Sequence, residues 1–219
     1  MRKLAAIAVA LTAAAFVSAA VAEPAAEIKL PPAQTTGGKP LMQALSDRHS
    51  TREFSDKTLP DQVLSNLLWA AAGVSRPDGK RTAPSAVNWQ EVDVYVALPQ
   101  GMYLFDAKAH ALKLAVAGDL RALTGKQPFV KDAPLNLVFV ADYARMTSKM
   151  MPIADADRNT YACTDTGFIS ENVYLFCSSE GLNTVVRGLI DKPALAQAMK
   201  LRPEQHIILA QTVGYPKAK

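Results

Sequence analysis

The segment that most constrains the fold is "LNLVFVADY", residues 135–143, because it is apolar almost without interruption. A strand with a continuous apolar run is buried on both faces, so this segment predicts the central strand of a sheet. The later segment "DTGFISENVYLFCSSEG", residues 165–181, carries apolar side chains at helical spacing, among them Ile169 and Val173. We expect this segment to form the core helix of the domain.

The other expected elements are shorter. Val92, Val94 and Val96 alternate with other residues and predict a strand over residues 91–98. The remaining predictions are helices over residues 41–47, 60–73 and 192–200, a hairpin over 101–107 and 110–115, and strands over 183–189 and 205–216. This order predicts an α+β layered domain with a mainly antiparallel or mixed sheet, not a run of βαβ units. No G-x-G-x-x-G follows the first strand, so a dinucleotide-binding Rossmann domain is disfavoured.

The first 22 residues are typical of a secretory signal peptide. A basic start, an apolar stretch and a small-residue A-x-A end predict cleavage before Glu23. A membrane anchor is the alternative, because the apolar stretch is long enough to span a bilayer. Residues 23–40, "EPAAEIKLPPAQTTGGKP", predict a flexible arm that could lie over a partner subunit, and residues 41–219 predict the folded domain. We expect an exported protein, periplasmic or secreted, with no stable membrane span after cleavage.

Charge and cysteine content exclude some classes of protein. The net charge of +4 is mild and gives no reason to expect nucleic acid, which requires a clustered basic surface. His49, His110 and His206 are scattered without metal-ligand spacing, so no metal site is expected. Export favours a disulfide between Cys163 and Cys177. However, 14 helical residues span about 21 Å, far beyond disulfide reach, so we expect two free thiols.

The first candidate binding motif is "SDRHSTREF", residues 46–54. Arg48, Ser50 and Arg52 point the same way in an extended segment, and the two arginines also share a face in a helix. Like charges repel, so an anion between them is expected; two planar, permanently charged donors and a hydroxyl suit one phosphate. The alternative is a solvated surface turn whose arginines pair with nearby carboxylates.

The second candidate motif is "TAPSAVNWQ", residues 82–90, just before the Val-rich strand. Ser85, Asn88 and Gln90 can both donate and accept hydrogen bonds. Such a mixture suits the edges of a heteroaromatic ring with carbonyl and N–H groups. The alternative is a polar loop that caps a helix.

The third candidate motif is "EGLNTVVRGLID", residues 180–191. Glycines on both sides of a short strand allow the backbone to approach a flat ligand closely. The alternative is an ordinary helix end followed by an edge strand, with Arg187 either paired or pointing into water.

Together these motifs resemble the FMN-dependent nitroreductases. The resemblance rests on "RHSTREF", "LLWAAAGVSRPDGKRTAPSAVNWQEVDVYV", "DTGFISENVYLFCSSEGLNTVVRG" and "VGYP", and it covers most of residues 41–216. It implies a three-layer α-β-α nitroreductase fold and an intertwined homodimer with FMN at the subunit interface.

The resemblance also implies which residues bind the cofactor. Its FMN-binding residues would be Arg48, His49, Ser50 and Arg52 toward the phosphate and ribityl chain, Pro84, Ser85 and Asn88 toward the ribityl chain or ring, and Val185, Val186, Arg187 and Gly188 along the N5 edge. Gln90 would be a neighbour, and Lys217 or Lys219 a further phosphate ligand. An arginine at position 187 and "WQ" at 89–90 depart from the family pattern, which leaves the substrate pocket open.

The implied activity is that of an oxidoreductase. Reduced nicotinamide, or another electron donor, would pass a hydride to flavin N5, and a nitroaromatic, quinone-like or other small conjugated acceptor would then take the same place in a ping-pong cycle. No side chain is expected to act as a catalytic nucleophile. The alternatives are a non-enzymatic flavin carrier and a flavin-free relative used for interaction. Export separates the protein from cytoplasmic NAD(P)H, so the donor stays open.

Overall fold

The computed structural model describes residues 23–149 and 151–217, so the expected signal peptide and Lys219 lie outside the described residues. The strands are β1 (Glu27–Lys29), β2 (Val92–Leu98), β3 (Gly101–Asp106), β4 (Ala111–Ala117), β5 (Leu135–Asp142), β6 (Asn183–Arg187) and β7 (Gln205–Gly214). The α-helices are α1 (Leu41–Asp47), α2 (Asp61–Ala72), α3 (Asp155–Glu180) and α4 (Lys192–Ala198). Short 3₁₀ turns are η1 (Ala86–Asn88), η2 (Arg121–Thr124), η3 (Pro128–Val130) and η4 (Tyr143–Arg145).

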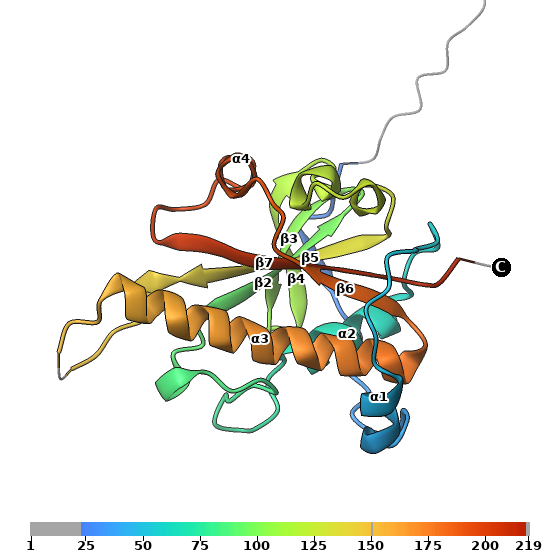
Figure 1. Ribbon diagram of the computed structural model, residues 1–219, viewed down its shortest axis with the longest axis horizontal. Coiled ribbons are helices and arrows are strands. Elements are labelled where there is room, and N and C mark those ends of the chain that lie inside the picture. The colour runs from blue at the N-terminus through green and yellow to red at the C-terminus, as the bar shows by residue number, and fades with distance from the viewer. Residues whose placement is uncertain (1–22, 150, 218–219) are drawn as a thin grey trace, which may run out of the picture.

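The strands form one sheet in the order β1-β4-β3-β2-β5-β7-β6, and every pair of neighbours in the described chain is antiparallel. Figure 1 shows α1, α2 and α3 on one face of this sheet and α4 on the other. The expected α+β class is confirmed, and the layers are helix, sheet and helix. The sheet is wholly antiparallel, the simpler of the two arrangements expected.

Strand β5 lies at the centre of the core, as its sequence predicts. All eight of its residues are buried, and it pairs with β2 on one side and β7 on the other. One cluster of buried side chains lies between the sheet and helices α2 and α3, and includes Leu67, Phe139 and Val173. A second lies on the face that carries α4 and includes Val138 and Leu195. Because β5 contributes to both clusters, its sequence has no polar face.

Helix α3 is longer than the sequence predicts. It begins at Asp155, ten residues before the expected start, and runs for 26 residues, or about 39 Å. Its first ten residues contain one buried side chain, Ala162, so no apolar stripe reveals them. Asp155 and Asp157 in the first turn favour the positive end of the helix dipole. Gly181 ends the helix in the left-handed conformation, with φ of 68°, as expected.

The expected flexible arm is largely packed onto the same chain. Residues 27–29 form β1 and pair with residues 111–113 of β4. Leu30 is 8% exposed and belongs to the core that α2 covers. The buried Ser65 hydroxyl of α2 donates a 2.6 Å hydrogen bond to the carbonyl of Pro31. The Pro-rich composition did not reveal the short strand β1 or the buried Leu30, which hold this segment in place.

The two cysteines are free thiols, as expected from their separation along one helix. Cys163 is exposed and Cys177 is buried. Burial raises the pKa of the Cys177 thiol, which keeps it protonated and unreactive. None of the helices in residues 23–149 and 151–217 is long and apolar enough to cross a membrane.

The contact between Ser65 and the arm can be tested in the mature chain. Ser65→Ala removes the hydroxyl that bonds Pro31 and lies 2.7 Å from His110 Nε2. We expect the free energy of unfolding in urea to fall by about 1–2 kcal/mol, because buried polar groups lose a partner. Limited proteolysis should then cut the arm faster. Ser75→Ala, at an exposed position, is the matched control. Equal stability and equal cleavage of the two variants would contradict the packed arm.

Candidate functional site

The segment that contains the first motif is extended and lies along the free edge of β6. The backbone N–H of Thr51 donates to Thr184 O at 3.0 Å, and Thr184 N–H donates to Thr51 Oγ1 at 3.1 Å. The extended conformation decides between the two geometries that the sequence allowed. Arg48, Ser50 and Arg52 therefore follow one side of the segment, because side chains alternate along an extended chain.

Tyr174 of α3 joins the first motif to the third. Its hydroxyl lies 2.8 Å from Ser50 Oγ and accepts a 2.9 Å hydrogen bond from the backbone N–H of Val186 in β6. In the contact between the two hydroxyl groups, either oxygen can be the donor. The guanidinium carbon of Arg48 lies 5.3 Å from the centre of the Tyr174 ring, within range of a cation–π contact. One buried tyrosine thus holds together residues that are more than 120 positions apart.

Arg48 and Arg52 are free to bind an anion. Across the described parts of the chain, neither forms an ion pair with a carboxylate. Asp47, an acidic neighbour of Arg48, instead pairs with Lys39 at 2.9 Å. The alternative interpretation, in which the arginines of this motif are neutralised by nearby carboxylates, is therefore not what the structure shows. An unpaired pair of guanidinium groups beside a hydroxyl is a suitable site for phosphate.

His49 alternates with the arginines and occupies different surroundings. Its Nδ1 donates to the carbonyl of Asp47 at 2.6 Å. Together with Thr51 it lines a cavity of about 200 Å³ between the segment, α3 and β6. His49 thus shapes the segment through its own backbone contact.

The second motif forms a tight loop against the N-terminal half of α3. Ser85 Oγ accepts from the backbone N–H of Gln90 at 3.0 Å, and Asn88 Oδ1 accepts from the Gln90 amide at 3.1 Å. Val87, Asn88 and Gln90 have positive φ angles of 42°, 60° and 51°. This conformation is unfavourable for a β-branched residue such as Val87, whose side chain is 80% exposed. Strain of this kind is often found at functional sites.

Within one protomer the second motif does not meet the first. The loop is attached to α3 where Asp165 Oδ2 accepts from the backbone N–H of Ala86 at 2.8 Å. Asp165 and Tyr174 are nine residues apart, which corresponds to about 13 Å and to two and a half turns. They therefore lie on opposite flanks of the buried face of α3. Pro84, which is exposed, belongs to the Asp165 side together with Ser85 and Asn88.

The third motif presents its backbone while the Arg187 side chain is locked inside. Arg187 is 4% exposed, and burial lowers the pKa of its guanidinium to about 10, so it remains charged at neutral pH. It donates to Thr124 O at 2.6 Å, Asn136 Oδ1 at 2.9 Å and Thr212 Oγ1 at 3.0 Å. All three acceptors are neutral. The network ties β6 to η2, β5 and β7, and keeps the Arg187 side chain away from any ligand at this strand.

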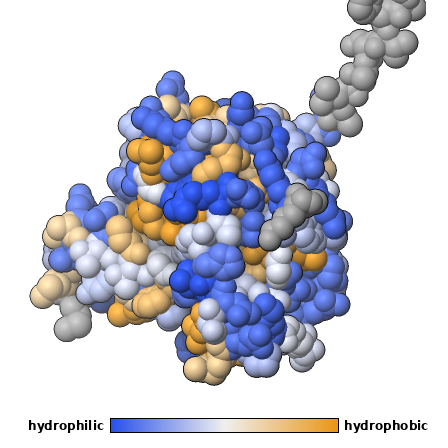
Figure 2. All heavy atoms as spheres, turned by 45° about the vertical axis from the view of Figure 1, so that its right-hand side comes forward, coloured by the Kyte–Doolittle hydropathy of each residue, from blue (hydrophilic) through white to orange (hydrophobic). Residues whose placement is uncertain are grey.

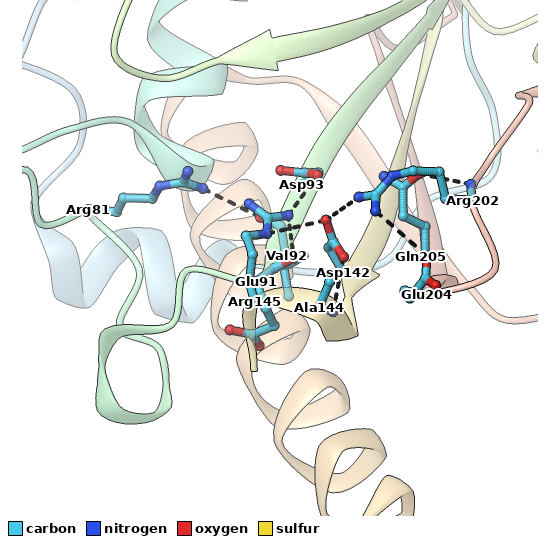
Figure 3. A network of polar contacts seen from close by, with 10 residues as sticks. All are labelled: Arg81, Glu91, Val92, Asp93, Asp142, Ala144, Arg145, Arg202, Glu204 and Gln205. Carbon is cyan, nitrogen blue, oxygen red and sulfur yellow. Dashed lines mark hydrogen bonds and ion pairs between the residues drawn. The ribbon is translucent and has the colours of Figure 1, made fainter. Parts of the chain in front are cut away.

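A row of alternating charges lies at the opposite end of the sheet (Figure 3). Arg145 pairs with Asp93 at 2.7 Å, and Arg202 pairs with Asp142 at 2.6 Å. Arg145 Nη2 also donates to the backbone carbonyl of Glu91 at 2.7 Å. These contacts fix the start of β2 and the end of β5, the strands that lead out of the second motif and into η4.

Tyr174 is the central residue that the sequence analysis missed. Its only signal is a position on the flank of the apolar stripe of α3, where a large side chain with a polar tip can reach a neighbouring backbone. Asp165 was also missed, because a carboxylate at the start of an expected helix reads as a favourable dipole contact.

Comparison with known proteins gives consistent matches. The model described as the nitroreductase family matches residues 45–215. A candidate nitroreductase of Methanocaldococcus jannaschii is 30% identical over 185 residues, which cover 80% of this chain and 90% of that protein. A candidate nitroreductase from Ralstonia eutropha JMP134, known from a crystal structure, is 47% identical in sequence with a TM-score of 0.83. The match covers 89% of this chain and 91% of that one. A candidate nitroreductase from Desulfovibrio desulfuricans, solved in complex with FMN, shares the fold with 20% identity, a TM-score of 0.59 and coverage of 83% of this chain and 89% of that one.

The buried Arg187 network can be tested through Gly125. A Cβ atom at position 125 would lie 2.0 Å from Arg187 Nη1. We expect Gly125→Ala to lower the free energy of unfolding by about 1–3 kcal/mol, the usual effect of overpacking. Gly167→Ala is the control, because no heavy atom lies within 4 Å of its added Cβ and alanine favours a helix. A Gly125→Ala protein as stable as the Gly167→Ala protein would show that Arg187 can move away freely.

Proposed function

The chain belongs to the nitroreductase family of oxidoreductases, and on this premise we propose that it binds FMN and transfers electrons to small conjugated acceptors. One observation carries the proposal. Arg48 and Arg52 have no carboxylate partner among the described residues and lie on the side of the extended segment that carries Ser50, and Tyr174 contacts Arg48, Ser50 and the backbone of β6. A phosphate-binding group beside the end of an edge strand suits a flavin mononucleotide, since this cofactor carries a phosphate at one end and a flat heteroaromatic ring at the other.

The residues present fit FMN. Arg48 and Arg52 would bind the phosphate with charge-assisted hydrogen bonds, and Ser50 would add a hydroxyl. The backbone of residues 185–188 would follow the edge of the ring, as in the family. The N–H of Val186 is bonded to Tyr174, so this tyrosine can exchange partners when a ligand arrives. Lys217 remains a possible further phosphate ligand.

We propose that the site is completed by a second copy of the chain. Ser85 and Asn88 lie on the opposite flank of α3 from Tyr174, so the ring contacts expected of them would come from the partner subunit. Large apolar side chains are exposed where a partner could cover them, including Leu41 and Met42 on α1 and Phe168 on α3. Figure 2 shows apolar surface among polar residues on the side of the molecule that carries α1 and β6. These features support a homodimer, which is common in the family.

The chemistry belongs to the cofactor, and the protein supplies position and surroundings. When bound, FMN supplies the hydride transfer that moves electrons from donor to acceptor. Arg48 and Arg52 would fix the phosphate, the β6 backbone would orient the ring, and Arg187 would keep β6 rigid. No side chain in the described site is placed to act as a nucleophile. The family implies reduced nicotinamide as donor and nitroaromatic or quinone-like acceptors in a ping-pong cycle. We further propose export to the periplasm or beyond, on the strength of the signal-like first 22 residues.

Paired arginine variants test the cofactor site. We expect Arg48→Ala combined with Arg52→Ala to weaken FMN binding by at least roughly 100-fold, because each lost hydrogen bond to a charged group costs about 1.5–3 kcal/mol. Flavin fluorescence titration measures the dissociation constant. Lys108→Ala in the β3–β4 turn, combined with Lys113→Ala at an exposed position of β4, removes the same charge in the half of the sheet far from β6, and should leave the dissociation constant unchanged. Equal FMN affinity in both double variants would contradict the proposed phosphate site.

Anaerobic reduction separates an enzyme from a carrier. We expect the purified mature protein to be yellow after incubation with FMN, and the flavin absorbance to bleach on addition of NADH or NADPH. Recovery of the absorbance with a quinone or nitroaromatic would complete the cycle. Bound FMN that no nicotinamide reduces would favour an electron carrier or a different donor. A protein that remains colourless with excess FMN would exclude both and favour a flavin-free role.

A further inference from the structure

Two buried carboxyl groups that the proposed function does not use, those of Glu91 and Asp165, interact with each other next to the second motif. Glu91, directly before β2, is 0% exposed, and Asp165 of α3 is 3% exposed. Neither carboxylate oxygen of Glu91 has a hydrogen-bond partner among the described residues. Asp165 Oδ2 accepts from the backbone N–H of Ala86 at 2.8 Å. Ionisation of a buried carboxyl group that has no hydrogen-bond donor from another residue is unfavourable, which favours the state in which the pair keeps one proton.

The charged groups around the pair do not neutralise it. Arg145 of η4 faces Glu91, but its guanidinium is paired with Asp93 and bonded to the Glu91 carbonyl. Arg81, in the loop before β2, is directed to the carbonyl of Val92 at 3.4 Å. The remaining charged neighbour is Asp165 itself. Burial first, and then the negative charge of Asp165, raise the pKa of the Glu91 carboxyl to about 7, against the opposing effects of the Glu91 backbone N–H and, more weakly, of Arg145.

Asp165 is the contact that attaches α3 to the strained loop. It holds Ala86 N–H at the start of η1, immediately before the three residues with positive φ. The loop is otherwise closed by bonds from Gln90, and by Trp89, whose Nε1 donates to Thr147 O at 2.8 Å. A strained conformation persists only when its surroundings hold it. A change in the charge of the carboxyl pair therefore acts on the loop directly.

We propose that Asp165 is a positioning residue for the loop of residues 85–90, and that a proton shared with Glu91 controls it. With the proton present, the Glu91 hydroxyl donates to one oxygen of Asp165 and the other oxygen holds Ala86 N–H. When the proton leaves to solvent, two buried carboxylates repel each other and the loop loosens. In its effect on the cofactor, this inference rests on the proposed function, because the loop carries Ser85 and Asn88. Flavin binding should then weaken as the pH rises through neutrality.

The loop can be followed without any ligand through Trp89. The chain has two tryptophans, so Trp69→Phe leaves Trp89 alone in the loop, where its ring centroid lies 5.6 Å from that of Tyr161. We expect the fluorescence of this protein to change in one step between pH 6 and pH 8. Adding Glu91→Gln should abolish the step, because the amide stays neutral and still donates to Asp165. Adding Glu171→Gln, an exposed position on α3, should preserve it.

Two substitutions at position 165 separate positioning from simple stability. Asp165→Asn keeps an oxygen that can accept from Ala86 N–H, and should give the low-pH Trp89 signal at every pH. Asp165→Ala removes the acceptor, and should give the high-pH signal throughout. A pH step that persists in Glu91→Gln, or Asp165→Ala and Asp165→Asn proteins with the same signal, would overturn the proposal.

The second readout is FMN affinity as a function of pH. The ratio of dissociation constants at pH 8.5 and pH 6 should be roughly tenfold larger in the unmodified protein than in Glu91→Gln, because a difference of about one pKa unit in Glu91 between the free and FMN-bound protein corresponds to a tenfold change in affinity. Comparing ratios cancels the ionisation of the FMN phosphate itself, whose second pKa is about 6. A Trp89 step without FMN binding at any pH would contradict the proposed function and leave the carboxyl pair supported. If FMN binds but the ratio of dissociation constants is the same in both proteins and Trp89 shows no pH step, the role of the carboxyl pair would be contradicted and the proposed function supported.

Discussion

The packing of α3 across the sheet is the constraint on which the rest of the structure depends. Its buried side chains, from Ala162 to Cys177, form one stripe against the strands. An apolar stripe fixes the rotation of a helix about its axis, because any other rotation exposes the stripe. The polar residues at the edges of the stripe are then fixed as well. Tyr174 is directed to β6 and Ser50, and Asp165 to the loop before β2. The packing of the apolar stripe fixes the positions of both side chains.

Charge burial in this protein follows two different routes, and the chemistry of the side chains explains the difference. A guanidinium cannot lose its proton at neutral pH, so Arg187 is stabilised by Thr124, Asn136 and Thr212 and ties four elements together. A carboxyl group can become neutral by taking up a proton, so Glu91 can be buried without a donor. The first route gives rigidity at all accessible pH values, and the second makes the surroundings sensitive to pH.

The regular elements could be predicted from the sequence because each is specified locally. The apolar run of β5 and the stripe of α3 require no knowledge of their partners. The short β1 could not be predicted, because it is held by β4, more than 80 residues away, and by contacts of its flanking residues Leu30 and Pro31 with the rest of the chain. The arrangement of the site could not be predicted either. The residues of a motif indicate which groups can bind a phosphate or a ring. They do not indicate on which flank of α3 the motif lies, because this depends on where the loop before β2 contacts the helix.

If the chain binds FMN as proposed, the separation of the motifs means that one copy of the chain would present only part of the flavin site. Arg48 and Ser50 lie with Tyr174 on one flank of α3, while Ser85 and Asn88 lie with Asp165 on the other. In a symmetric pair, each flank can face the opposite flank of the second copy, so two incomplete sites per chain become two complete sites per dimer. The apolar side chains exposed on α1 and α3 are then the surface that such a pair would bury. Each α3 would serve both sites, with its tyrosine in one and its aspartate behind the other.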